Sequence, residues 1–291
     1  MQRQINRRSF LQRLWKSALS VIGLSGSTYY YAKYIEPNRL SIQQETISSI
    51  KIPQSFHNVT ILQFSDIHIG FHYTMQQFAQ LIKTIQLQQP DLLLFTGDLF
   101  DVPNTVSVVE LQQASQLLAT VQAPLGKYWI YGNHDHGGYG TDIIAHYMEI
   151  GGFQLLQNEH QYIEKNGQCI CLAGIDDVIL GQPDGKRALQ HSDRNLFTIM
   201  MCHEPDYAEE MKELPIDIQL SGHSHGGQIQ LPFIGHLITP PYAQQYVEGW
   251  YNVPNSSSYL YVSRGIGTTR LPYRLLCMPE FTIHTLQSKS K

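Results

Sequence analysis

The sequence predicts an α/β fold, and two observations carry this prediction. From residue 45 onward, short apolar runs of strand-like composition alternate with longer stretches of helical periodicity. The composition fits a globular protein, because 42% of the 291 residues are hydrophobic and only 15% are charged. This balance excludes disordered, collagen-like and coiled-coil proteins, and the length is sufficient for a large core.

The apolar runs and the helical stretches follow one another in a definite order. The apolar runs predict strands near residues 46–52, 59–65, 91–96, 126–131, 169–174, 196–202, 216–221, 227–231, 246–251, 258–263 and 280–286. The periodic stretches predict helices near residues 74–88, 105–121, 139–150 and 205–213. The first half therefore consists of repeated βα units, whereas the second half is richer in strands.

Charge is distributed unevenly along the chain. The formal net charge is −4, which argues against a surface that coats nucleic acid. Residues 1–40 contain seven basic residues and one acidic residue, so residues 41–291 hold 13 basic and 23 acidic residues, a balance of −10. We therefore predict a basic tail at 1–40, one α/β domain at 41–291, and no nucleic-acid partner.

The N-terminal residues resemble a twin-arginine export signal. The run Arg7-Arg8-Ser9-Phe10-Leu11 is followed by a weakly apolar stretch from Ser17 to Ala32. No small-x-small cleavage site follows it, and a cluster of tyrosines stands there instead. The resemblance implies that residues 1–40 are an export signal or an uncleaved membrane anchor with a linker. The twin-arginine export machinery and the membrane would then be partners, and the domain would face the periplasm or the cell exterior.

Five of the apolar runs end in residues that can bind metal or exchange protons. In order of the runs, these are Asp66 with His68, Asp98 with Asp101, Asn133 with His134 and Asp135, His203, and His223 with His225. Open α/β sheets place their binding sites at the carboxyl ends of the strands, so we expect these side chains to converge. Glycine precedes Asp98, Asn133 and His223, where it allows the backbone to turn sharply out of the strand.

Seven of these side chains form a candidate metal site: Asp66, His68, Asp98, Asn133, His203, His223 and His225. Their nitrogen and oxygen donors, without thiolate, suit divalent Mn, Fe or Zn and disfavour a cysteine-based zinc site. Seven ligands are too many for one ion, so we predict two adjacent divalent ions that share one carboxylate. Such a pair can generate hydroxide at neutral pH and hold a phosphoryl oxygen. The four cysteines lie in apolar segments and are predicted to be buried thiols.

Between residues 66 and 225 stand, in order, the motifs D-x-H, G-D-x-x-D, G-N-H-D, a single His and G-H-x-H. This set resembles the calcineurin-like metallophosphoesterases. The resemblance implies a four-layer αββα sandwich, in which helices flank two mixed β-sheets. It also implies that Asp66, His68 and His225 bind one ion, that Asn133, His203 and His223 bind the other, and that Asp98 bridges them.

The resemblance further implies roles for residues that do not bind metal. His134 would face the substrate, to stabilise phosphoryl charge or protonate the leaving group, and Asp101 would orient His134. Asp135 is predicted to support its own loop. Val102 stands where the protein phosphatases of the family have an arginine, which disfavours a protein substrate. The implied reaction is in-line attack on phosphorus by a metal-bridging hydroxide.

The substrate is less constrained than the reaction. Together with the export-like tail, residues 263–267 and 279–280 make the chain similar to a bacterial subgroup of exported phosphodiesterases. This similarity implies a lipid-linked phosphodiester or pyrophosphate, such as UDP-2,3-diacylglucosamine of the lipid A pathway. Two alternatives stay open: a soluble phosphodiesterase acting on nucleotides or cyclic nucleotides, and an inactive metal-bound interaction module. Inactive members usually lack ligands or the substrate-facing histidine, whereas this chain has the full set.

The remaining polar residues are predicted to lie outside the site. The histidines without an assignment are His57, His72, His136, His146, His160, His191, His236 and His284. Asp176 and Asp177 are predicted to lie in a solvated loop, and the surface is predicted for Lys186, Arg187, Arg194, Arg264, Arg270 and Arg274. The aromatic and proline-rich stretch from Leu231 to Tyr251 is predicted to be a loop that faces the substrate or a membrane.

Overall fold

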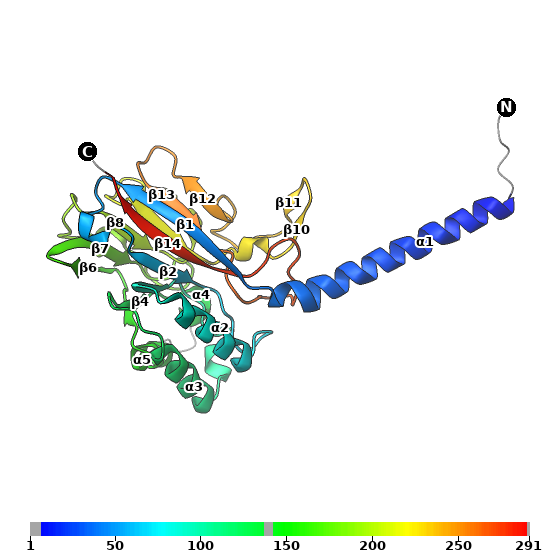
Figure 1. The fold of residues 1–291 in the computed structure, drawn as a ribbon, viewed down its shortest axis with the longest axis horizontal. Coiled ribbons are helices and arrows are strands. Elements are labelled where there is room, and N and C mark those ends of the chain that lie inside the picture. The colour runs from blue at the N-terminus through cyan, green and yellow to red at the C-terminus, as the bar shows by residue number, and fades with distance from the viewer. Residues whose placement is uncertain (1–6, 137–141, 290–291) are drawn as a thin grey trace.

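The computed structural model describes residues 7–136 and 142–289, which form two six-stranded β-sheets and a small hairpin (Figure 1). The first sheet has, in spatial order, β1 (Ser41–Ser49), β14 (Glu280–Ser288), β2 (Thr60–Phe64), β3 (Leu92–Phe95), β4 (Lys127–Trp129) and β5 (Gln154–Leu155). The second has β12 (Gly249–Asn252), β13 (Tyr259–Val262), β9 (Ile218–Ser221), β8 (Thr198–Met201), β7 (Gln168–Gly174) and β6 (Glu159–Lys165). The hairpin joins β10 (Gln230–Leu231) to β11 (Gly235–His236).

Both sheets are mixed: the first has one antiparallel pair, β14 with β2, and the second has an antiparallel strand at each edge. The strands β2, β3, β4 and β5 run parallel, whereas β14 pairs antiparallel with β2. In the second sheet, β7, β8, β9 and β13 run parallel, and β6 and β12 are antiparallel edge strands. The carboxyl ends of the parallel strands in each sheet therefore lie at one edge of that sheet.

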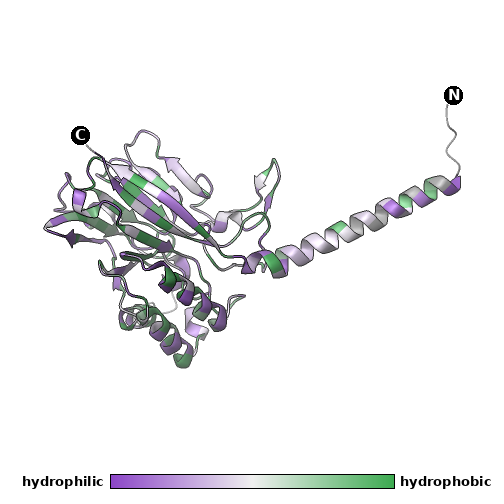
Figure 2. Ribbon diagram, in the orientation of Figure 1, coloured by the Kyte–Doolittle hydropathy of each residue, from purple (hydrophilic) through white to green (hydrophobic). Residues whose placement is uncertain are grey.

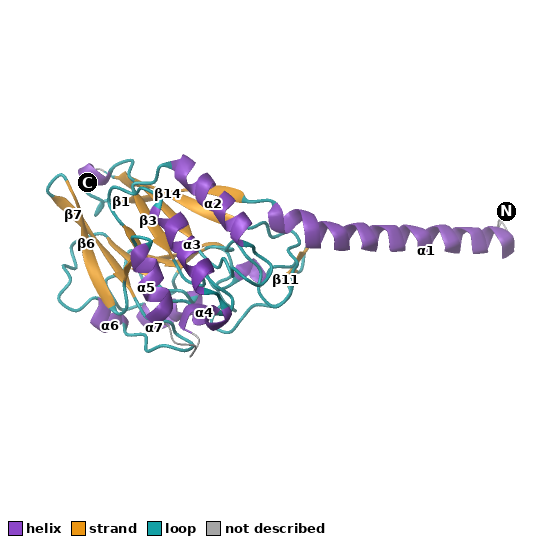
Figure 3. Ribbon diagram, turned by 90° about the horizontal axis from the view of Figure 1, so that it is seen from below, coloured by secondary structure: helices purple, strands orange, loops and turns teal. Residues whose placement is uncertain are grey.

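Helices cover the outer faces of the sheets. The helices are α1 (Arg7–Tyr30), α2 (Met75–Gln88), α3 (Val108–Ala119), α4 (Asn133–His136), α5 (Asp142–Ile150), α6 (Gly185–Ala188) and α7 (Ala208–Met211). Helices α2, α3 and α5 pack on the first sheet, and the short α6 and α7 pack on the second (Figure 3). Capping boxes begin α2 at Thr74 and α3 at Ser107.

The core has layers because side chains alternate along each strand. Leu62 and Phe64 of β2 point toward the helices, whereas Ile61 points between the two sheets. There it packs in one cluster with residues of the opposite sheet such as Leu172 and Ile199. The arrangement is thus helix, sheet, sheet, helix, and the predicted four-layer αββα sandwich of two mixed sheets is confirmed.

Several predicted elements differ from the observed ones. The strands β5 and β6 were not predicted, because β5 is very short and β6 is a largely polar edge strand. Asn166 and Gly167, both with positive φ, form the β6–β7 turn and were the available signal. Of the strand predicted at 227–231, only β10 is a strand. The first strand begins at Ser41, earlier than predicted, because an edge strand tolerates alternating polar residues. Residues 139–141 of the predicted helix 139–150 lie outside the described residues.

The N-terminal helix α1 extends away from the sandwich (Figure 1). Hydrophilic and hydrophobic residues are mixed along it (Figure 2). Within the described parts of the chain, none of the helices combines the length and hydrophobicity needed to cross a membrane. After α1, Ala32 O accepts a hydrogen bond from Arg274 N at 2.9 Å, and the buried Glu36 accepts one from Cys277 N. The domain boundary at residue 40 stays a prediction, although residues 32–36 already pack on the sandwich.

Candidate metal centre

The structure brings the predicted site residues together at the carboxyl ends of five parallel strands. Asp66 and His68 follow β2, Asp98 and Asp101 follow β3, and Asn133 begins α4 shortly after β4. His203 follows β8 of the second sheet, and His223 and His225 follow β9. The two sheets therefore contribute to one site, because their strands end at the same side of the sandwich.

The loops that carry these residues have an unusual backbone. Five of the predicted ligands have left-handed φ values between 50° and 67°: Asp66, His68, Asp98, His223 and His225. This region costs a residue with a side chain about 1–2 kcal/mol, and such strain is concentrated at functional sites. The folded protein imposes this backbone so that several side chains can leave adjacent turns in one direction.

Glycines make these turns possible in two different ways. Gly97, before Asp98, has a φ of 101°, as expected for a sharp turn. Gly132 and Gly222 do not have positive φ, so their role differs from the predicted one. A Cβ on Gly132 would meet the Asp98 carboxylate, and one on Gly222 would meet Ser65 and Asp66. These two glycines provide space for the ligands of neighbouring loops.

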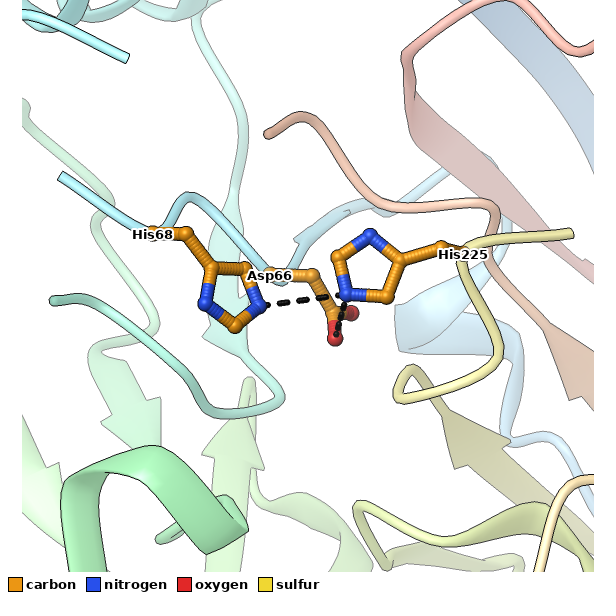
Figure 4. A group of neighbouring side chains, drawn as sticks. All are labelled: Asp66, His68 and His225. Atoms are coloured by element: carbon orange, nitrogen blue, oxygen red, sulfur yellow. Dashed lines mark hydrogen bonds and ion pairs between the residues drawn. The ribbon is translucent and has the colours of Figure 1, made fainter. Parts of the chain in front are cut away.

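Asp66, His68 and His225 form the first cluster (Figure 4). The Nε2 atoms of His68 and His225 are 3.1 Å apart, and His225 Nε2 is 3.4 Å from Asp66 Oδ1. Metal–nitrogen bonds of about 2.0–2.1 Å place neighbouring ligand atoms about 2.8–3.4 Å apart in octahedral or tetrahedral geometry. The three side chains therefore have the spacing of ligands around one ion.

Asp98, His203 and His223 form the second cluster. Asp98 Oδ2 lies 3.3 Å from His203 Nε2 and 3.5 Å from His68 Nε2 of the first cluster. One carboxylate oxygen thus faces donors of both clusters, which is the arrangement a bridging ligand requires. Asn133 Oδ1 is buried without a hydrogen-bond partner, so this oxygen keeps free acceptor capacity. The donor set fits divalent metal ions.

Backbone carbonyls orient the imidazoles of His203 and His223. His203 Nδ1 donates to Thr96 O at 2.6 Å, and His223 Nε2 donates to Pro241 O at 2.9 Å. In the neutral imidazoles, these bonds select the tautomers that leave a lone pair on His203 Nε2 and on His223 Nδ1. The carbonyls were not predicted, since a backbone acceptor leaves no residue-type signal in the sequence.

The environment also sets the charge of the histidines. Burial and the neighbouring His203 lower the pKa of His223 to about 3. Burial and His68 hold the pKa of His225 well below its ordinary value. Both imidazoles are therefore neutral near neutral pH, the form in which histidine binds metal. For His203, burial lowers the pKa, but Asp98 outweighs burial and the pKa lies well above its ordinary value.

Asp101 and His134 lie beside the first cluster. The Asp101 carboxylate is 3.0 Å from His68 Nδ1 and 3.6 Å from His134 Nδ1. His134 Nδ1 donates to the Asp101 backbone carbonyl at 2.6 Å, and His134 N donates to Asp98 Oδ1 at 2.8 Å. Asp101 therefore contacts His134 chiefly through its backbone, and its carboxylate is nearer to the candidate ligand His68.

Asp135 supports more than its own loop. It accepts hydrogen bonds from Gly132 N in that loop, at 3.1 Å, and from Asp98 N and Leu99 N in the neighbouring one, at 2.5 and 2.9 Å. The carboxylate thus ties the loop after β4 to the loop after β3, and so fixes Asp98 relative to Asn133.

Two predictions about surface residues are wrong. Arg274 is fully buried, and its guanidinium donates to the carbonyls of Gly267, Cys277 and Arg264. Asp176 and Asp177 are also buried, and both accept hydrogen bonds from the backbone of their own loop. Asp176 also pairs with His136 at 3.0 Å. In each case a folded loop supplies the partners that water would otherwise provide.

A model of the calcineurin-like phosphoesterase family matches residues 59–227, more than half of the chain and the segment that carries all the candidate ligands. The chain belongs to this family. The predicted family membership is confirmed, and a metal-dependent phosphoester hydrolase is the activity that this membership establishes.

Relatives in this phosphoesterase family match the chain over most of its length. The uncharacterized metallophosphoesterase YkuE of Bacillus subtilis is 43% identical and covers 98% of this chain and 99% of its own. The phosphodiesterase YaeI of Escherichia coli is 29% identical, with 96% and 98% covered. The UDP-2,3-diacylglucosamine pyrophosphatase LpxG of Chlamydia trachomatis is 26% identical, with 86% and 91% covered. This phosphoesterase is therefore similar to YkuE and YaeI over nearly its whole length.

Proposed function

We propose that this phosphoesterase uses two divalent ions to hydrolyse a phosphodiester or pyrophosphate bond in a lipid-linked substrate, such as UDP-2,3-diacylglucosamine. The observation that carries the two-metal part is the position of Asp98 Oδ2, between His68 of one cluster and His203 of the other. Asp66, His68 and His225 hold one ion, Asn133, His203 and His223 hold the second, and Asp98 bridges them.

The protein contributes to this reaction by holding the metal ligands in fixed positions. Two bound ions supply a hydroxide nucleophile at neutral pH and neutralise charge on the phosphoryl oxygens. Asp98 keeps a fixed position because its backbone N–H and its carboxylate are both hydrogen-bonded, to Asp135 and to His134 N. Preorganised groups of this kind need no reorganisation when charge develops in the transition state.

His134 is the group that moves a proton in this proposal. Its Nδ1 is engaged by the Asp101 carbonyl, so Nε2 is the atom left to donate to the leaving oxygen. Burial lowers the pKa of His134, but the charge of Asp98 and the Asp101 carbonyl outweigh burial and raise it above the ordinary value. The protein's own groups therefore favour the protonated imidazole that a general acid needs.

Two observations support a lipid-linked substrate and a site at the membrane. LpxG, one of the relatives, is named for a substrate with acyl chains. A cavity of about 240 Å³ lies between the segment that follows α1 and the loops that contain His72 and Thr268. Lys33, Tyr34, His72 and Thr268 form part of its lining. The cavity lies close to a candidate ligand, because Gly267 of its lining donates a hydrogen bond to Asp66 O.

Metal analysis combined with a turnover panel tests the proposed reaction. The panel contains an activated phosphodiester, a phosphomonoester, a cyclic nucleotide and UDP-2,3-diacylglucosamine, and the expected result is two ions per chain and preference for the acylated sugar nucleotide. Asp98→Asn should lose metal and turnover, whereas Asp193→Asn, at an exposed loop carboxylate, should lose neither. Preference for the cyclic nucleotide would support the soluble alternative, and inactivity of metal-loaded protein on all four would exclude the proposed reaction.

We also propose that the tail directs export by the twin-arginine machinery and holds the enzyme at the outer face of the cytoplasmic membrane. Replacing Arg7 and Arg8 by lysine keeps the charge and removes the guanidinium pair. We expect the Arg7→Lys/Arg8→Lys protein to accumulate in the cytoplasm, measured by fractionation and protease accessibility in cells. Unchanged export of that variant would contradict the proposal.

A further inference from the structure

The hairpin formed by β10 and β11 carries an exposed apolar tip. Phe233 and Ile234 occupy the turn, with exposed fractions of 109% and 71%, and Leu237 and Ile238 follow at 51% and 74%. Scattered single apolar residues on a surface need no explanation, whereas a contiguous group of large ones marks a contact surface. We call Phe233 and Ile234 the hairpin tip.

The segment around the hairpin tip lacks acidic residues, lysine and arginine. From Gly226 to Val247 there is no aspartate, glutamate, lysine or arginine. The exposed part of this segment, residues 232–238, can therefore enter an apolar medium without the desolvation penalty that charged groups impose. Water-exposed loops have no comparable reason to exclude every charged residue.

Two further segments lie against the base of the hairpin. Gln230 N donates to Leu275 O and Leu275 N donates to Gln228 O, both at 2.9 Å, which attaches the loop 268–276 to the hairpin. The same loop attaches to the end of α1, where the rings of Tyr29 and Tyr273 are 5.7 Å apart. The hairpin and α1 consequently project from the same end of the molecule (Figure 1 and Figure 3).

These neighbouring segments add apolar and positively charged groups. Leu271 and Leu276 are 51% and 55% exposed, and Tyr30 and Tyr34 are exposed at the end of α1. The ionic groups that reach solvent in residues 30–39 and 268–276 are cations, namely Lys33, Arg39 and Arg270, because the acidic Glu36 is buried. An apolar tip beside aromatic residues and cations is complementary to a bilayer that contains anionic lipid.

We infer that the hairpin tip inserts into the acyl region of an anionic lipid bilayer, as a second membrane contact beside the tail. The segment that begins with the hairpin ends near the metal centre, since Pro241 O accepts a hydrogen bond from the candidate ligand His223. Insertion would therefore place the metal centre close to the membrane surface. The inference deepens the proposed function and rests on it in one respect, that a lipid-linked substrate lies in the bilayer.

The test measures the depth of the tip directly, in the full-length chain. A Trp15→Phe/Phe233→Trp protein carries a reporter at the tip. A Trp15→Phe/Leu87→Trp protein carries one at another exposed position, near the end of α2, where the side chain is 80% exposed against 109% for Phe233. Each is mixed with vesicles of phosphatidylglycerol and phosphatidylethanolamine whose acyl chains are brominated. We expect the tryptophan at 233, and not the one at 87, to shift its emission to shorter wavelength and to be quenched.

A second substitution shows whether the apolar tip causes insertion. Adding Ile234→Glu to the reporter protein should abolish the emission shift, whereas adding Leu87→Glu should leave it unchanged, with thermal unfolding checked for both. A protein that binds the vesicles while the tryptophan at 233 stays unquenched would overturn the inference, as would absence of vesicle binding. A concentration-dependent dimer that Ile234→Glu dissociates, without any vesicle response, would identify a contact between copies and also overturn it.

These measurements require no turnover. Quenching at 233 in a protein inactive on UDP-2,3-diacylglucosamine would retain the membrane contact and reject the proposed substrate. Turnover of that substrate without quenching would do the reverse. Failure of the inference and failure of the proposed function can therefore be distinguished.

Discussion

At the scale of single residues, Asp98 connects the two clusters of candidate ligands. Its carboxylate faces His68 and His203 and accepts the backbone N–H of His134, and its own N–H is held by Asp135. Burial raises the pKa of Asp98, but His203 and His134 outweigh burial and lower it well below the ordinary value. The carboxylate is therefore ionised, as a metal ligand must be.

His134→Ala should separate catalysis from metal binding. We expect turnover to fall by about 10²–10⁴-fold, the usual contribution of a general acid, with metal content unchanged. The measurements are kcat and metal content of the purified variant. Loss of metal along with activity would mean that His134 is a ligand. The measurement is needed because His134 lies within ligand distance of His68 and Asp98.

Asp135→Asn should weaken the link between two ligand-bearing loops. The amide keeps one carbonyl oxygen and presents an NH₂ group to backbone donors that Asp135 now satisfies, leaving at least one of them unpaired. An unpaired buried donor costs about 1–3 kcal/mol, so we expect lower stability in denaturant titration and weaker metal binding. Asp193→Asn is the exposed control, and equal stability of the two variants would contradict this account.

Metal binding should become tighter as pH rises. The pKa of His203 is raised by Asp98, so the imidazole holds a proton that the ion must displace, whereas His223 is already neutral. Displacing one proton predicts an increase in affinity of about tenfold per pH unit below the pKa of His203. Competition with a chelator at several pH values measures this slope, and a flat profile would rule out the proton displacement.

At the scale of elements, the strand ends and the segment after α1 behave differently. The ligand loops could be predicted because each follows an apolar run and carries a family motif. The segment 31–38 belongs to the predicted signal or anchor with its linker at 1–40, yet Ala32 and Glu36 are buried on the sandwich. Its sequence gives little indication of this, because the partners Arg274 and Cys277 lie far along the chain.

Removal of residues 1–30 and of residues 1–40 should therefore have different consequences. The shorter truncation removes α1 and leaves the packed segment, so we expect unfolding near that of the full chain. The longer one leaves Arg274 N and Cys277 N without their acceptors, and we expect a loss of roughly 1–3 kcal/mol for each donor that stays unpaired. Denaturant unfolding of both proteins provides the comparison, and equal stabilities would show that residues 31–40 are only a linker.

At the scale of the whole molecule, the two sheets must pack correctly before the centre exists. One cluster joins Asp66 and His68 of the first sheet to His225 of the second, and the other joins Asp98 to His203 and His223 in the same way. Ligands that come from both sheets stabilise the sandwich when an ion binds, because the ion binds the folded state in preference to the unfolded one.

Chelation should consequently affect both activity and stability. An ion present at 1,000 times its dissociation constant contributes about 4 kcal/mol, so removing it should lower the unfolding temperature in calorimetry and abolish turnover. Return of Mn²⁺, Fe²⁺ or Zn²⁺ should restore both, and the most effective ion indicates the native one. Unchanged turnover after complete removal of metal would contradict a metal-dependent reaction.

The sequence by itself determined the fold class, the family and the positions of the candidate ligands. These depend on local patterns, namely apolar runs followed by glycine, aspartate, asparagine and histidine, which a single chain segment contains in full. It also indicated that the tail is basic and the domain acidic, because the net charge of a segment can be summed from its residues alone.

Only the tertiary structure decided which side chains share a cluster, that Asp98 Oδ2 faces both, and that the Asp101 carboxylate is nearer to His68 than to His134. It also decided the burial of Arg274, Asp176 and Asp177 and placed the hairpin at the end of the molecule from which α1 projects. The physical reason is common to all of these: hydrogen bonds, burial and pKa values depend on partners that are distant in sequence. Such partners become neighbours only when the two sheets pack together.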